Sequence, residues 1–134
     1  MDILHPIVFS DNEIHDLISL LEKREQTTIL FQREMSGVWF YDENWEMELR
    51  ILLLADIRLT ISRVCFIHRH QGTMTEVFHW LVEFCKVHHI KEICVQSVES
   101  KEMANWCIKN NFVPDPNSTF PIDNFICGDY KIQL

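Results

Sequence analysis

The hydrophobic periodicity of this chain changes at Gly72, one of only three glycines in 134 residues. Before Gly72, residues 27–67 are rich in β-branched and aromatic side chains and read as extended segments separated by short turns. After Gly72, apolar residues recur at the spacing of an amphipathic helix. The inward stripe of this helix is expected to hold Met74, Val77, Phe78, Leu81, Phe84 and Cys85. The chain must therefore fold into a structure in which a strand leads through a glycine turn into a long helix.

Capping and turn signals predict the elements before this turn. Ser10 and Glu13 can form a capping box, which predicts a helix from Asp11 to Gln26. The extended segments predict an antiparallel meander of four strands, at residues 27–35, 37–41, 45–55 and 58–67. In the third strand, alternation places Trp45, Met47 and Leu49 on one face and Glu46, Glu48 and Arg50 on the other.

The segment after the long helix predicts a second strand and helix. Residues 91–98 form a short apolar run, and residues 100–111 have helical spacing, with Asn111 as a left-handed terminator. The order strand, helix, strand predicts a parallel crossover in the sheet.

Residues 113–121 contain three prolines and are expected to form a loop. The final residues, 124–134, are expected to form a hairpin that turns at Gly128 and Asp129. The predicted fold class is therefore α/β (α+β), with a mixed, mostly antiparallel central sheet flanked by helices. We expect one domain that spans residues 1–134.

Charge and cysteine content narrow the classes of partner. A net charge of −8 disfavours binding to nucleic acid or to anionic membrane surfaces. No apolar run approaches the roughly 20 residues of a membrane span, and the N-terminus lacks the pattern of a signal peptide. The cysteines lie inside apolar segments, which is typical of reduced thiols. They are Cys65, Cys85, Cys94, Cys107 and Cys127. We expect a cytoplasmic protein.

The sequence RHQGTM, residues 69–74, has the features of an anion-binding turn. The first N–H groups of a helix have no partner within the helix, and they attract negative charge. Gly72 would let a ligand approach the main chain, and Arg69 could add a charge-assisted contact. The alternative is that Gly72 only permits a tight turn between strand and helix.

The stretch VCFIHRHQGTM, residues 64–74, resembles the cofactor turn of the GNAT superfamily of acetyl-coenzyme A (acetyl-CoA)-dependent N-acetyltransferases. In that family a central strand leads into an Arg/Gln-x-x-Gly-x-Gly/Ala turn and then a long helix. Arg69 and Gly72 fit this pattern, and Met74 stands where the family has glycine or alanine.

A second stretch, SKEMANWCIKNNF, follows the family frame Asn-x-x-Ala-x-x-Leu-Tyr-x-Lys-x-Gly-Phe. Lys109 and Phe112 match it, Ser100 stands at the asparagine position and Cys107 at the tyrosine position. The resemblance runs from Leu59 to Phe112, and it implies the mixed sheet of the GNAT fold. Only one helix is predicted before the meander, where the family usually has two.

The resemblance implies transfer of an acetyl group from acetyl-CoA to a primary amine, on a small molecule or a peptide terminus. The implied cofactor-binding residues are Val64, Cys65, Phe66, Arg69, His70, Gln71, Gly72, Thr73, Met74 and Ser100. The pyrophosphate would rest on the N–H groups of residues 70–74, and the pantetheine would lie along residues 64–66. Met74 could crowd the diphosphate, or it could turn away along the apolar stripe of the helix.

Three residues are candidates for the proton transfers. Glu46 and Glu48 are candidate bases for the amine, although solvated charges on a sheet face are the simpler interpretation. Cys107, at the tyrosine position, is the candidate acid for the leaving thiolate, with core packing as the favoured alternative. Tyr130 could replace it only if the last strand brings it near the cleft.

Other constellations give weaker signals. His68 and His70 could share a face, but no third ligand stands at a suitable spacing, so no metal site is predicted. The aromatic segment GVWFYDENW could form an acceptor pocket, a subunit interface or simply core. A GNAT-like domain retained for protein interaction, without catalysis, is the alternative function. An edge strand or the final hairpin could also pair with a second copy in a homodimer.

Overall fold

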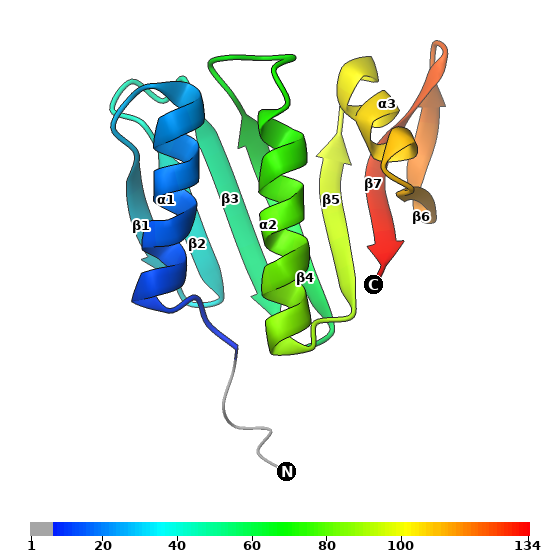
Figure 1. Cartoon of the computed structure of the whole chain (residues 1–134). Helices are drawn as coiled ribbons and strands as arrows, with labels where there is room; N and C mark the ends of the chain where they lie inside the picture. Colours follow the sequence, from blue (N-terminus) through cyan, green and yellow to red (C-terminus); the bar gives the residue numbers. More distant parts are fainter. Residues whose placement is uncertain (1–6) are drawn as a thin grey trace.

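The structure is a computed structural model, and it describes residues 7–134. Within this range the chain forms three helices and seven strands. In chain order they are α1 (Asp11–Glu25), β1 (Leu30–Glu34), β2 (Gly37–Tyr41), β3 (Glu48–Leu54), β4 (Arg58–Cys65), α2 (Thr73–His88), β5 (Glu92–Val98), α3 (Lys101–Lys109), β6 (Val113–Ile122) and β7 (Phe125–Gln133). The strands make one sheet in the order β1-β2-β3-β4-β5-β7-β6 (Figure 1).

The sheet is mixed, with one parallel pair. Strands β4 and β5 run parallel because α2 crosses between them, and the other neighbouring strands are antiparallel. The predicted fold class and the predicted parallel crossover are both confirmed. As expected, one helix precedes the meander in the part of the chain that the structure describes.

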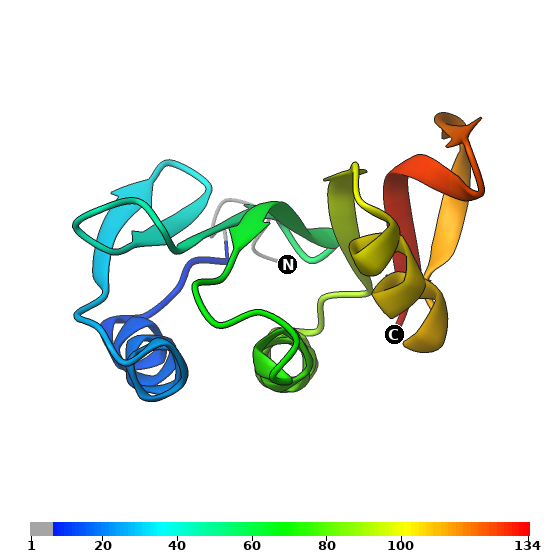
Figure 2. The same ribbon diagram turned by 90° about the horizontal axis from the view of Figure 1, so that it is seen from above.

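Helices α1 and α2 lie side by side on one face of the sheet, and α3 packs against β7 (Figure 2). The core lies between the helices and the sheet. Side chains with no exposed surface there include Leu17, Leu21, Val77, Leu81, Phe40, Leu49, Ile51, Leu59, Ile61 and Ile93. The opposite face of the meander carries ion pairs such as Arg50 with Glu34. None of the helices within residues 7–134 combines the length and apolar character required to cross a bilayer.

The local signals for α1 and α2 act as predicted. Ser10 and Glu13 form both hydrogen bonds of the capping box at the start of α1, and the chain leaves α1 through Gln26 in the left-handed region. All six residues of the predicted inward stripe of α2 are buried. Asn111 terminates the α3 segment with φ of 70°.

The prediction of a loop at residues 113–121 is wrong, because this segment is strand β6. Strand β6 is an edge strand and pairs only with β7. Its prolines lack an N–H, and this is tolerated because no second strand needs that hydrogen bond. Its pairing with β7 is irregular between Pro114 and Thr119.

The predicted turn at Gly128 and Asp129 is also wrong. The chain reverses between Ile122 and Phe125, and Gly128 lies inside β7. Gly128 has φ of 119°, and a Cβ there would lie 2.2 Å from the carbonyl oxygen of Ser118. This glycine is therefore required by the close approach of two strands.

Candidate functional site

Strands β4 and β5 separate after a short stretch of pairing. Three residue pairs join them, from Leu59 with Ile93 to Ile61 with Val95. Beyond these pairs β4 continues to Cys65 and β5 continues to Val98, so the two strand ends diverge. We call the space between residues 62–65 and 96–98 the β4–β5 gap. Main-chain groups of β4 that face this gap have no neighbouring strand to bind.

Irregular backbone in both strands accompanies the gap. The pairing of β3 with β4 shifts register next to Arg50, and the pairing of β5 with β7 shifts between Val95 and Val98. Ser97 lies in that second irregularity with φ of 55°. Bulges bend a strand and increase its twist. Such bending accounts for the end of the pairing between β4 and β5 after Ile61 and Val95.

A cavity of about 470 Å³ lies at the end of β4, between the turn into α2 and the start of α3; we call it the helix-side cavity. Every predicted cofactor-binding residue except Gln71 lines it: Val64, Cys65, Phe66, Arg69, His70, Gly72, Thr73, Met74 and Ser100. Gln71 instead presents its carbonyl oxygen to Arg24 Nη1 at 3.1 Å. The turn also contains His70 with φ of 61°, a left-handed conformation that is uncommon outside glycine.

The N-terminus of α2 opens onto this cavity without a side-chain cap. Gly72 is the N-cap residue, with φ of 83° and no side chain to accept from the first N–H groups. A Cβ at Gly72 would meet no atom within 4 Å, so a side chain there would point into open space. The hydroxyl of Thr73 is buried and has no hydrogen-bond partner among the described residues. These are free donors at the positive end of a helix, which suits an anionic ligand.

Met74 is 8% exposed and belongs to the hydrophobic core. Its place in the apolar stripe of α2 turns the side chain inward, where it forms part of the cavity wall. The structure thus agrees with the second of the two alternatives for Met74.

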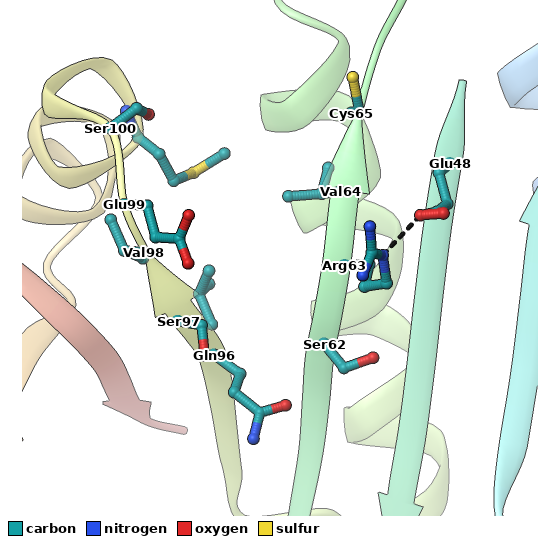
Figure 3. Close-up of a pocket in the computed structure, with 12 residues that line it drawn as sticks. Glu48, Ser62, Arg63, Val64, Cys65, Gln96, Ser97, Val98, Glu99 and Ser100 are labelled. Atoms are coloured by element: carbon teal, nitrogen blue, oxygen red, sulfur yellow. Dashed lines mark hydrogen bonds and ion pairs between the residues drawn. The ribbon is translucent and has the colours of Figure 1, made fainter. Parts of the chain in front are cut away.

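A second cavity of about 350 Å³ adjoins the first; we call it the gap cavity (Figure 3). The two cavities share Val64, Cys65, Ser100 and Met103, so they meet across the β4–β5 gap. The polar lining of the gap cavity comes from Glu48, Ser62, Arg63, Gln96, Ser97, Glu99 and Ser100.

Two carboxylates face the gap cavity from opposite sides. Glu48 lies on β3, with 14% of its side chain exposed, and accepts a 2.6 Å hydrogen bond from Arg63 Nε. Glu99 follows β5, and its carboxylate points into the space between β5 and β4 (Figure 3). The cavity can therefore attract a cation, and Arg63 partly compensates the charge of Glu48.

Glu46 does not share this position, so the prediction of one strand over residues 45–55 is wrong at its start. Strand β3 begins at Glu48, and Glu46 is exposed in the preceding bend and lines neither cavity. The bend forms because Trp45 is left-handed, with φ of 55°, and because Asp42 Oδ1 accepts from the N–H of Met47 at 2.8 Å. Trp45 stacks on Tyr41, with ring centroids 4.4 Å apart.

Cys107 and Tyr130 are core residues in the structure. Cys107 is fully buried, and burial raises the pKa of its thiol to about 12. Burial also raises the pKa of Tyr130, whose hydroxyl donates to the carbonyl oxygen of Ile126 at 2.7 Å. Neither residue lines the two cavities, so the geometry agrees with the packing interpretation for Cys107.

Arg63 and Glu99 are not among the site residues predicted from the sequence. Both contribute charge to the gap cavity, yet neither belongs to a local motif. Glu99 carries one usable signal, because it stands at the carboxyl end of a predicted parallel strand, where α/β sheets place their ligands.

Comparison with known proteins identifies the architecture. No family model matches the sequence, and no curated protein matches it. A GNAT family acetyltransferase from Elizabethkingia anophelis, solved with acetyl-CoA bound, superposes with a TM-score of 0.51 at 12% identity, over 100% of this chain and 95% of that chain. The chain has the GNAT fold. The predicted resemblance is thus confirmed for the fold.

Two further solved structures superpose on this chain. Ard1 from Thermoplasma volcanium has a TM-score of 0.52 at 11% identity, over 94% of this chain and 80% of that chain. N-acetylglutamate synthase from Neisseria gonorrhoeae, complexed with coenzyme A and L-arginine, has a TM-score of 0.50 at 10% identity, over 96% of this chain and 32% of that chain. At sequence identities this low, the superpositions establish the fold alone. The chemistry has to be argued from the residues of the site.

Proposed function

We propose that the protein is an N-acetyltransferase that transfers the acetyl group of acetyl-CoA to a primary amine, on a small molecule or a peptide terminus. The observation that carries the proposal is the helix-side cavity, which runs from the uncapped N-terminus of α2 to the β4–β5 gap. A relative in fold has been solved with acetyl-CoA bound, which supports the choice of ligand.

The residues of the helix-side cavity fit the parts of coenzyme A. The N–H groups of residues 70–74 and the unpartnered hydroxyl of Thr73 would bind the pyrophosphate, with Arg69 adding a charge-assisted contact. The open space at Gly72 leaves room for phosphate oxygens next to the main chain. Main-chain groups of Val64 to Phe66 on the side of the β4–β5 gap would bind the amides of the pantetheine arm and stabilise negative charge that develops on the thioester oxygen.

The gap cavity would receive the acceptor amine. The carboxylates of Glu48 and Glu99 attract an ammonium group, and the cavity meets the helix-side cavity where the thioester would lie. We assign Glu48 as the base that takes a proton from the ammonium, because it is the predicted candidate that lines this cavity. Glu46 is exposed outside the gap cavity and does not line it, so it is not the base in this proposal.

Titration calorimetry with acetyl-CoA and with coenzyme A tests the cofactor assignment. Gly72→Asp places a carboxylate in the proposed phosphate site and should weaken binding about 100-fold, by charge repulsion in a partly desolvated cavity. Gly72→Asn is the control for charge, because asparagine has the same shape, tolerates positive φ and carries no charge. Both side chains can cap the N–H groups of α2, so both variants should bind less tightly than the wild type. Gly72→Asn should still bind about tenfold more tightly than Gly72→Asp, and this difference isolates the effect of the charge.

Two results would contradict the assignment. One is the absence of wild-type binding at millimolar coenzyme A, which would leave the interaction-module alternative. The other is equal affinity of the Asp and Asn variants, which would move the pyrophosphate away from Gly72.

Glu48→Gln tests the proposed base. The variant should lower kcat about 100-fold with an accepted amine, since general-base catalysis contributes factors of that order. Its affinity for acetyl-CoA should not change, because Glu48 does not line the helix-side cavity. Glu46→Gln is the control and should keep wild-type kcat. A kcat for Glu48→Gln within threefold of the wild type would remove Glu48 from the mechanism.

A further inference from the structure

The C-terminal end of α1 contacts the turn that leads into α2 at two places. Glu25, the last residue of α1, has a carboxylate that accepts hydrogen bonds from the N–H groups of Ile67 and His68. Arg24 pairs with Glu76 on α2, and its Nη1 donates to the carbonyl oxygen of Gln71 at 3.1 Å. One helix end therefore holds both the beginning and the end of the turn.

The position of Glu25 is unfavourable for a residue with no specific task. Its side chain is buried, with 1% of the residue exposed. A buried carboxylate loses its hydration, and the negative end of the α1 dipole repels it further. Its hydrogen bonds within the described residues go to main-chain N–H groups of the turn. A stable apolar core would be easier to build with a hydrophobic residue at this position.

The turn itself has little regular structure to fix its shape. It contains no helix or strand between Cys65 and Thr73, and it includes the left-handed residues His70 and Gly72. N–H groups that bind a ligand do so most tightly when their directions are fixed before binding. The contacts from Glu25 and Arg24 supply that fixation.

We propose that Glu25, assisted by Arg24, is a positioning residue that holds the turn in the shape that binds the pyrophosphate of coenzyme A. This inference rests on the proposed function. Glu25 lines neither cavity, so it acts through the main chain of Ile67 and His68 and does not touch the ligand. The N-terminal helix, which carries none of the family motif, thereby becomes part of the cofactor site.

The test compares Glu25→Gln with Glu22→Gln. Glu22 is a matched control, because it lies on the same helix and its Oε2 also accepts from a main-chain N–H, that of Ile29 at 3.0 Å. Ile29 precedes β1 and is remote in sequence from the turn. Coenzyme A affinity is measured by calorimetry, and thermal unfolding is measured for both variants.

We expect Glu25→Gln to weaken coenzyme A binding about tenfold, since one acceptor oxygen becomes an amide donor that repels an N–H. Glu22→Gln should lower the unfolding temperature without changing the affinity more than twofold. Amide hydrogen exchange should become faster at residues 67–72 in Glu25→Gln and remain unchanged there in Glu22→Gln.

Arg24→Lys gives a second measurement if Glu25→Gln does not fold. It keeps the charge but loses the forked contact with Glu76 and Gln71, and it should weaken coenzyme A binding about threefold. If the wild type binds coenzyme A and Glu25→Gln binds it with the same affinity, the positioning role is overturned and the proposed function stands. The same conclusion follows from unchanged affinity in Arg24→Lys if only that variant folds. No wild-type binding would overturn the proposed function, and the positioning role with it.

Discussion

The β4–α2 junction and the β5–α3 junction lie at the same end of the sheet, and each leads from a strand into a helix (Figure 1). At the start of α3, Ser100 has φ of −115°, and its hydroxyl accepts from the N–H of Met103 at 3.2 Å. At the start of α2, Gly72 has φ of 83° and no cap. The same topology thus gives one terminus with a side-chain cap, which satisfies the N–H of Met103, and one terminus at which no side chain of the described residues caps an N–H.

A glycine at the N-cap costs stability, about a few tenths of a kcal/mol relative to a residue with a capping side chain. Helix α1 is also closed, by the capping box of Ser10 and Glu13. Among the three helices of the described chain, α2 alone gives up this stabilisation, and it does so beside the largest group of predicted ligand-binding residues. The cost is understandable if a ligand supplies the missing partners.

The largest expected effect in this comparison comes from the cations near the two junctions. Arg69→Ala should weaken coenzyme A binding about tenfold and reduce its salt dependence, because the side chain adds a charge-assisted contact at the open terminus. Lys101→Ala, at the first residue of α3, is the control and should change the affinity less than twofold. Titrations at low and high salt measure both quantities, and equal losses in the two variants would mean that only net charge matters.

A smaller effect is expected from opening the closed junction. Ser100→Ala should destabilise the protein by about 1 kcal/mol, since it removes the cap of α3. Ser100→Asn should restore most of that stability, because asparagine is a good N-cap residue. Denaturant unfolding measures both variants.

Coenzyme A binding by Ser100→Asn separates the two roles of Ser100, which lines both cavities. Its affinity should stay within about threefold of the wild type if capping is the main task of the hydroxyl. A tenfold loss in this stable variant would instead show a direct contact with the ligand.

The smallest effect is expected far from both junctions, at the Glu34–Arg50 pair on the open face of the sheet. The hydrogen bonds from Arg50, at 2.8 Å, hold the pKa of Glu34 below its usual value. A lowered pKa in the folded state means that the pair stabilises the protein above the unfolded pKa and loses this effect as pH falls through the folded value.

Glu34→Gln should therefore reduce stability by about 0.5 kcal/mol at neutral pH, as for a partly exposed ion pair, and by less in acid. Thermal unfolding of the wild type and of Glu34→Gln between pH 7 and pH 3 measures whether the difference in their stability becomes smaller in acid. Coenzyme A affinity should be unchanged, and a change would mean that the junctions are coupled to the open face.

Local features of the sequence predicted most of this molecule. The turn at residues 69–74, its glycine and the apolar stripe of α2 lie within a short segment, so a few neighbouring residues determine their arrangement. The same applies to the capping box at Ser10. The loop prediction for residues 113–121 is wrong because proline breaks a central strand but is tolerated at an edge, and edge position depends on the order of strands in the whole sheet.

Long-range contacts could not be predicted from such patterns. Glu25 and Ile67 are 42 positions apart, and no periodicity links them. Alternation correctly placed Glu48 and Leu49 on opposite faces of the sheet. The tight bend at Trp45 leaves Glu46 outside the strand. Both outcomes depend on tertiary packing, which overrides local preference.

The β4–β5 gap also has a consequence for aggregation. Unpaired strand edges invite pairing with other extended chains, and proteins usually protect them. The outer edge at β6 has three prolines for this purpose. The edge of β4 beyond Ile61 has no such protection and lies inside the sheet, between two diverging strands. An extended ligand in the gap would complete this edge as an added strand does. The proposed cofactor would therefore leave fewer main-chain groups of β4 available for pairing with other extended chains.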